Sequence, residues 1–171
     1  MRIDDLPGEL LMWVLIGSEV AVFAAGITVM EAVRLTDPAG FATAQGMLDG
    51  RMATLNTALL VTSGLFAARA ERDGGRAGLL LAALGGVAFL AVKIAEYTAD
   101  AARGVTMEAH PFFTFYYLLT GFHAAHVIAG VVVLVLVAIR PRRDTAQAAA
   151  MFWHMVDLVW VLLLAPVYLL G

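Results

Sequence analysis

Eight ionisable side chains lie within long apolar stretches of this sequence. A charged or titratable group in such surroundings needs a partner, a water-filled cavity or a function, because an isolated charge there is costly. Histidine and carboxylate side chains can ligate metals, transfer protons or form hydrogen bonds between helices. The candidates for this chemistry are Glu19, Glu31, Lys93, Glu96, His123, His126, His154 and Asp157.

The three histidines among them fall into two pairs of residues three positions apart, which puts both members of each pair on one face of a helix. One pair is His123 and His126, and the other is His154 and Asp157, in which the carboxylate can accept from the imidazole. Histidines on different helices can ligate a metal or hold haem, but axial ligands lie on opposite sides of the ring, so His123 and His126 cannot share one iron. We therefore favour a network of hydrogen bonds between helices, and the metal and haem interpretations stay open as alternatives.

Glu19 is the most isolated of the carboxylates. It lies about ten residues into the first apolar stretch and has no cation within one turn of its own helix. We expect it to be protonated or bonded to another helix, and a proton relay through it is the alternative, because buried carboxylates titrate in a useful range. Lys93 and Glu96 are expected to form a local, structural ion pair, and Glu31 is expected at a solvated helix end.

The composition places these residues in a membrane protein. The chain has 171 residues, of which 61% are hydrophobic and 15% are charged, and its mean hydropathy is +0.85, whereas a soluble domain carries about 25% charged residues. A net charge of −3 with 11 basic residues gives no broad basic face for nucleic acid. The lack of cysteine excludes thiolate metal sites, iron–sulfur clusters and disulfides.

The elements that position the candidates are five apolar stretches, each expected to be a transmembrane helix. We predict an all-α integral membrane bundle that forms a single domain over residues 1–171. Small residues recur four apart in three of the stretches, at residues 17–25, 78–86 and 121–129, and predict close helix packing. The five spans cover residues 10–33, 52–68, 77–97, 112–139 and 145–170.

The distribution of basic residues predicts the orientation. Seven basic residues lie at the N-terminus and in the loops around residues 69–76 and 140–144, which five spans put on one side. Only Arg34, Arg51 and Arg103 lie on the other side. We therefore expect a cytoplasmic N-terminus and a periplasmic or external C-terminus.

Five segments resemble one known family, in the family's order. They are WVLIGSEVAVF (13–23), LNTALLVTSG (55–64), KIAEY (93–97), TGFHAAHVIAG (120–130) and FWHMVDLVW (152–160). Together they are similar to subunit III of the haem–copper oxidases, the cytochrome c oxidase subunit III family, in its five-helix bacterial form. FYYLLTGFH (115–123) and the ending VLLLAPVYLLG resemble the NorE-type branch associated with nitric oxide reductase.

The resemblance implies an accessory subunit of the bacterial inner membrane that binds no haem or metal itself. Haem with copper or non-haem iron is then expected in a catalytic subunit I, accompanied by a redox subunit, and the chain is expected to pack against subunit I, bind phospholipid and support proton uptake. Glu19 matches the family's buried carboxylate. The intramembrane polar network of the family is matched by His123, His126, His154 and Asp157.

Two other functions remain as alternatives. One is an autonomous membrane cytochrome of the b type, in which His123 or His126 pairs with His154 around haem. The other is a proton-coupled transporter that uses Glu19 and Lys93, which the absence of an internal repeat and of broken helices disfavours.

Overall fold

A computed structural model describes residues 10–73 and 75–169, and every regular element among them is helical. The prediction of an all-α chain is therefore confirmed for the described residues. The helices are α1 (Leu10–Arg34), α2 (Pro38–Gln45), α3 (Gly50–Asp73), α4 (Arg76–Ala102), α5 (Pro111–Ile139) and α6 (Arg143–Leu164), and α6 continues into a π-helical turn, η2 (Ala165–Leu169).

Four helical segments in the described part of the chain are long and apolar enough to cross a membrane. They are α1, α4, α5 and the continuous stretch of α6 with η2. The expected second span lies within α3, which has 24 residues but is not among the four. Its apolar part is short because Asn56, Ser63 and the charged turn at 69–73 interrupt it.

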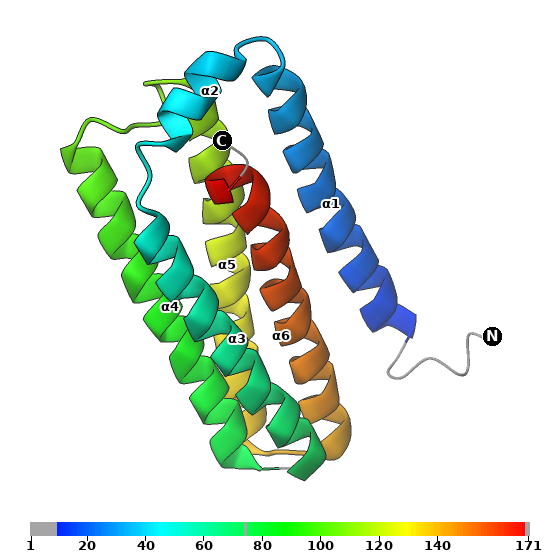
Figure 1. Cartoon of the computed structure of the whole chain (residues 1–171). Helices are drawn as coiled ribbons and strands as arrows, with labels where there is room; N and C mark the ends of the chain where they lie inside the picture. Colours follow the sequence, from blue (N-terminus) through cyan, green and yellow to red (C-terminus); the bar gives the residue numbers. More distant parts are fainter. Residues whose placement is uncertain (1–9, 74, 170–171) are drawn as a thin grey trace.

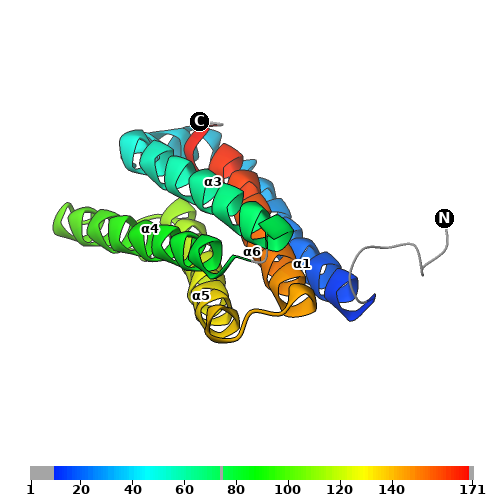
Figure 2. The same ribbon diagram turned by 90° about the horizontal axis from the view of Figure 1, so that it is seen from below.

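Helices α3, α4, α5 and α6 run alternately up and down and pack as a four-helix bundle (Figure 1). Seen along its length, α1 lies beside this bundle on the side of α6 (Figure 2). Close approach within the bundle depends on small residues, as at Gly86, where an added Cβ would lie 2.5 Å from the Trp153 ring. The small-residue stripe on α4 therefore does pack, as its spacing predicts.

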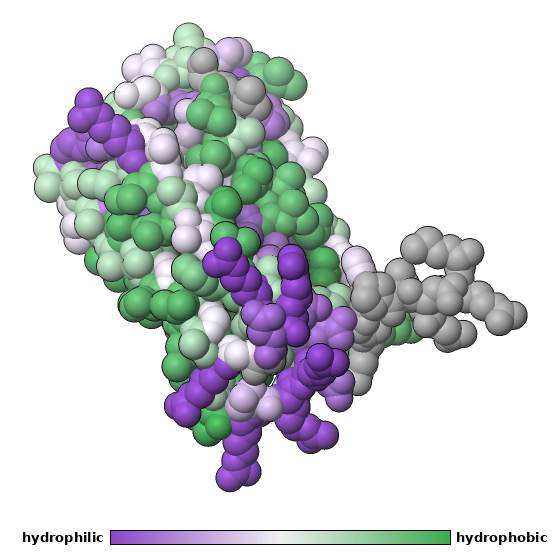
Figure 3. Space-filling model, turned by 60° about the horizontal axis from the view of Figure 1, so that its bottom comes forward, coloured by the Kyte–Doolittle hydropathy of each residue, from purple (hydrophilic) through white to green (hydrophobic). Residues whose placement is uncertain are grey.

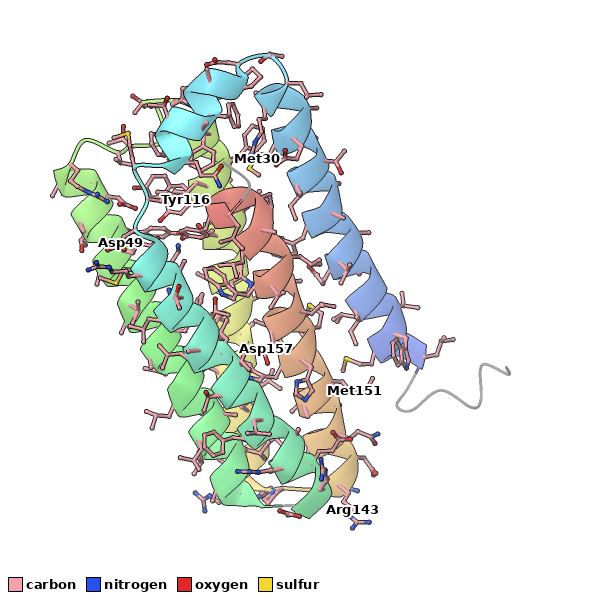
Figure 4. The ribbon with its side chains drawn as sticks, viewed as in Figure 1. Met30, Asp49, Tyr116, Arg143, Met151 and Asp157 are labelled. Atoms are coloured by element: carbon pink, nitrogen blue, oxygen red, sulfur yellow. The ribbon has the colours of Figure 1, made fainter. Side chains whose placement is uncertain are left out.

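Helix α1 approaches the bundle at one end and leaves it at the other. Near its C-terminus, Arg34 donates to the Pro166 carbonyl oxygen at 2.7 Å, and a Cβ at Gly26 would lie 2.7 Å from Leu119. Toward its N-terminus α1 diverges from α6 (Figure 1). A groove of about 450 Å³ opens there between the two helices, and Met151 lies on the side of α6 that faces it (Figure 4).

The two ends of the bundle differ in charge. Hydrophilic side chains gather at the end where α3 terminates and α6 begins, and the flanks are largely hydrophobic (Figure 3). We call this the basic end, after Arg69, Arg72, Arg76, Arg140, Arg142 and Arg143.

The opposite end is covered by α2, and we call it the capped end. Helix α2 is not one of the predicted apolar stretches, although Pro38 at its first position and Asp37 as its N-cap are the usual signals of a helix start. Asp37 accepts from the Gly40 N–H at 3.0 Å, and its carboxylate lies 3.4 Å from the His110 ring at the start of α5. These two contacts lower the pKa of the Asp37 carboxyl below its ordinary value. The contact with His110 also ties the start of α2 to the start of α5.

Candidate functional site

The largest group of buried charges projects inward from α4. Lys93, Glu96 and Asp100 recur at the helical spacing that puts them on one face, and all three side chains are buried. The Lys93 ammonium lies 3.0 Å from Glu96 Oε2, at the position where the sequence predicts a local ion pair. Buried ion pairs persist only when further hydrogen bonds satisfy their remaining donors and acceptors.

Two tyrosines from other elements supply those bonds. Lys93 Nζ donates to the Tyr168 hydroxyl at 2.7 Å and lies 3.4 Å from that of Tyr116. Tyr168 in turn donates to Glu96 Oε1 at 2.7 Å. The Tyr116 hydroxyl lies 3.0 Å from Glu96 Oε1 and 3.1 Å from Asp100 Oδ2, and because it carries one proton it donates to one carboxylate at a time. The cluster thereby joins α4, α5 and η2.

Aromatic rings complete the surroundings of the Lys93 ammonium. Its nitrogen lies 4.7 to 5.5 Å from the ring centres of Tyr97, Tyr116, Trp160 and Tyr168, which is within the range of cation–π attraction. Asp100 is bonded to Arg103, whose side chain is 50% exposed. Two cations therefore balance two carboxylates in what we call the Lys93 cluster: Lys93, Glu96, Asp100, Arg103, Tyr116 and Tyr168.

Sequence reasoning found only two members of this cluster. Asp100 carries a readable signal, because it is seven residues after Lys93 and so lies on the same helix face. Tyr116 precedes the histidine motif by less than two turns of α5 and gives no comparable signal. Tyr168 is brought in by η2, whose π-helical geometry changes the direction of the last side chains.

Glu19 bonds across helices, to His126 of α5. Its Oε2 lies 3.0 Å from His126 Nε2, and His126 Nδ1 lies 2.8 Å from the Phe122 carbonyl oxygen. Since a carbonyl oxygen only accepts, Nδ1 carries a proton, and Nε2 and Glu19 share one more. The pair is therefore either imidazolium with carboxylate or imidazole with carboxylic acid, and it has no net charge in either form.

His123 lies apart from that pair, in an aromatic enclosure. Its ring centre is 5.5 Å from that of Phe89, 5.4 Å from that of Trp160 and 6.4 Å from that of Phe23. The side chain is fully buried, and neither ring nitrogen bonds to any residue that the structure describes. Phe89 and Trp160 would have to move before haem could reach this imidazole.

His154 and Asp157 lie together on α6, facing α3. His154 Nδ1 is 3.8 Å from Asp157 Oδ2, which is an ion-pair separation but too long for a hydrogen bond. Gly64 of α3 makes room for this carboxylate, since a Cβ there would lie 2.3 Å from Asp157 Oδ2. The four residues expected in one polar network thus occupy three separate places. Among the described residues, His126 is the one of the four whose side chain bonds to a side chain of another helix, that of Glu19.

The arrangement is suited to holding helices together and to sharing protons within pairs. Among residues 10–73 and 75–169, no three histidine, aspartate or glutamate side chains come together as a metal-ligand group. Within the Lys93 cluster, Lys93 bonds to Glu96, and in the separate pair Glu19 bonds to His126.

Comparison with known proteins gives a consistent result. A sequence model of the family described as Cytochrome c oxidase subunit III matches residues 10–171. The chain is 33% identical over 123 residues to a cytochrome c oxidase subunit 3 of Corynebacterium diphtheriae, covering 67% of this chain and 60% of that protein. It is 30% identical over 169 residues to the same subunit of a Synechocystis species, covering 90% and 71%. It is also 23% identical over 179 residues to a quinol oxidase subunit 3 of Bacillus spizizenii, covering 93% and 85%.

Proposed function

The chain belongs to the cytochrome c oxidase subunit III family, and from this premise we propose that it is an accessory subunit, without redox centres of its own, of a haem–copper respiratory complex. Haem with copper or non-haem iron is assigned to a catalytic subunit I, which works with a separate redox subunit. The observation that carries the proposal is the family match, which extends over residues 10–171 and so includes every described helix.

The interior geometry supports a structural role in the complex. The Lys93 cluster is closed by hydrogen bonds and aromatic rings, and the Glu19–His126 pair fastens α1 to α5. Hydrogen bonds between helices of this kind rigidify a protein and favour one arrangement of its helices. A bundle ordered in this way can present a fixed surface to a larger partner.

We infer oxygen as the terminal acceptor from the names of the relatives, which are oxidase subunits. Nitric oxide is the alternative, since two segments resemble the NorE-type branch. The two are separated by assaying the captured complex with each gas: consumption of oxygen supports the first, and consumption of nitric oxide without oxygen uptake supports the second.

We propose a bacterial inner membrane location, with α3 as a fifth spanning helix and the basic end in the cytoplasm. Support for the fifth span comes from α3 packing along α4, where Ser63 donates to the Ala82 carbonyl oxygen at 2.7 Å. The chain has no cysteine, so single cysteines can be introduced cleanly. In intact cells, an impermeant maleimide should label Thr36→Cys and spare Asp73→Cys, because these exposed positions lie before α3 and at its far end. The reverse pattern contradicts the orientation, and equal labelling of both contradicts α3 as a span.

We also propose that phospholipid binds along the apolar flanks of the chain and that the subunit sustains proton uptake by its partner. Removal of the chain is the test of this role. A complex assembled without it should keep its haem spectrum but lose activity faster during turnover, and added chain should restore the rate. Identical sustained turnover with and without the chain would refute the role.

A further inference from the structure

Helix α1 is the least enclosed of the long helices. Of its 25 residues only Phe23 and Met30 are buried. Leu11, Leu15 and Glu19 recur four apart and Val22 follows one turn later, so these four residues form one stripe, which we call the α1 stripe. Its three apolar members are all exposed.

Glu19 gives this apolar stripe a polar centre. The side chain is 27% exposed and that of its partner, His126, is 16% exposed. Glu19 Oε2 bonds to His126, and no described residue donates to its second oxygen. An acceptor that is open at membrane depth is costly in lipid, and ionisable groups in spanning helices therefore face protein or a hydrated cavity. The second oxygen of Glu19 therefore needs a hydrogen-bond donor from outside the described residues.

The groove beside α1 extends the same surface toward the basic end. It is about 450 Å³ in volume, and Leu11 and Leu15 of the stripe form part of its wall. From α6 it is lined by Ala148 and Met151, with Asp144, Thr145 and Gln147 at its polar end. The α1 stripe and the groove together carry apolar side chains between Glu19 and the polar end of the groove, and this surface is complementary to a helix that carries apolar side chains between two donors.

We propose that the α1 stripe and this groove receive one transmembrane helix of the catalytic subunit, which places a hydrogen-bond donor against Glu19. The inference rests on the proposed function, because that function supplies the partner. The donor is a hydroxyl, amide or cationic side chain. In either proton arrangement of the Glu19–His126 pair, the shared proton lies between Oε2 and Nε2, so the second oxygen of Glu19 can only accept. The apolar side chains on either side of the donor fill the groove.

A photo-crosslinking amino acid at Leu15 or Val22 tests the position of the interface. Leu84 and Ile94 of α4 are exposed apolar controls on another face. In native membranes that contain the full complex, the two stripe positions should crosslink to the haem-containing subunit, and the α4 positions should not.

Several results would overturn the inference. Crosslinks from α4 alone, or stripe adducts only with lipid or with a second copy of this chain, would refute the docking face and leave the accessory function standing. If wild-type chain captures no catalytic subunit at all, the proposed function fails, and the docking face fails with it.

Two substitutions at Glu19 test the donor. Glu19→Gln keeps an acceptor oxygen and an amide that can face His126, so capture of the catalytic subunit should stay near the wild-type level. Glu19→Leu removes the acceptor and should lower capture about tenfold, the effect of one lost hydrogen bond within a membrane. Thermal unfolding of the isolated variants controls for the lost bond to His126. Equal capture by both variants would show that no donor meets Glu19.

Discussion

Replacement of Lys93 by methionine should destabilise the bundle, because it leaves two carboxylates in the interior with one half-exposed cation. Lys93 Nζ contacts Glu96 and the hydroxyls of Tyr116 and Tyr168. Methionine fills a similar volume but supplies no donor and no charge. Breaking a buried ion pair by removing one partner costs about 3 to 5 kcal/mol. For a chain of this size that corresponds to a fall in Tm of about 6 to 20 °C.

A second substitution separates the cost of the unpaired Glu96 carboxylate from the other effects of losing Lys93. In Lys93→Met with Glu96→Gln, the unpaired carboxylate is gone, and the amide oxygen can still accept from Tyr168. The double variant should therefore be more stable than Lys93→Met by about 1 to 2 kcal/mol. Arg51→Met is the matched control, since it removes an exposed cation, and its stability should stay within about 0.5 kcal/mol of wild type.

The assay is thermal unfolding in mild detergent, followed by circular dichroism. Tryptophan fluorescence includes a contribution from Trp160, whose ring centre lies 5.5 Å from the Lys93 nitrogen. If Lys93→Met has the same Tm as wild type, the cluster contributes nothing to stability. If the double variant is no more stable than the single one, the loss does not come from an unpaired carboxylate, and the electrostatic reasoning is wrong.

Two further predictions concern packing and the capped end. Gly86→Ala should cost about 1 to 3 kcal/mol of unfolding free energy, because the new Cβ meets the Trp153 ring. Gly50→Ala is the control and should not destabilise the chain, because nothing lies within 4 Å of its new Cβ. Equal losses of unfolding free energy in both variants would contradict the packing argument. The lowered pKa of Asp37, caused first by a backbone N–H of α2 and then by His110, means that the stabilisation is present above its ordinary pKa of 3.8 and is lost as pH falls through the lowered value. Asp37→Ala should remove this acid dependence of Tm, and an unchanged acid profile would refute it.

The family and the helical class were predictable because both depend on patterns that the chain carries along its length. Apolar stretches of about 20 residues predict helices, and the helices in the described residues extend past most of them. The family prediction is confirmed by a match that begins at residue 10. The boundaries were less predictable, since polar ends such as residues 69–73 continue the α3 helix.

The partners across helices were not predictable from spacing. A separation of three residues shows that His123 and His126 share a helix side, but it does not show that one meets Glu19 and the other lies among aromatic rings. These outcomes depend on the rotation of each helix in the bundle. The same limit hid Tyr168, because its place beside Lys93 depends on a π-helical turn at the end of α6.

Small-residue stripes show the same difference between local pattern and packing. The small-residue pattern on α4 lies against Trp153 as expected. The small-residue pattern on α1, which is distinct from the α1 stripe, begins at Gly17, where an added Cβ would meet nothing within 4 Å. One sequence pattern therefore marks an internal contact on α4. On α1 the same pattern begins at a residue, Gly17, that is two positions from Leu15 and from Glu19 and therefore lies on the opposite face of the helix.

Capture of the tagged chain from its native membranes tests the accessory-subunit account most directly. The captured material should contain a haem-bearing catalytic subunit, identified by mass spectrometry and by a reduced-minus-oxidised absorption spectrum, and the spectrum should vanish when that subunit is stripped away. A chain that emerges alone would contradict the account. So would a chain that keeps a haem spectrum by itself and loses it on His154→Ala, because that result would make it an autonomous cytochrome.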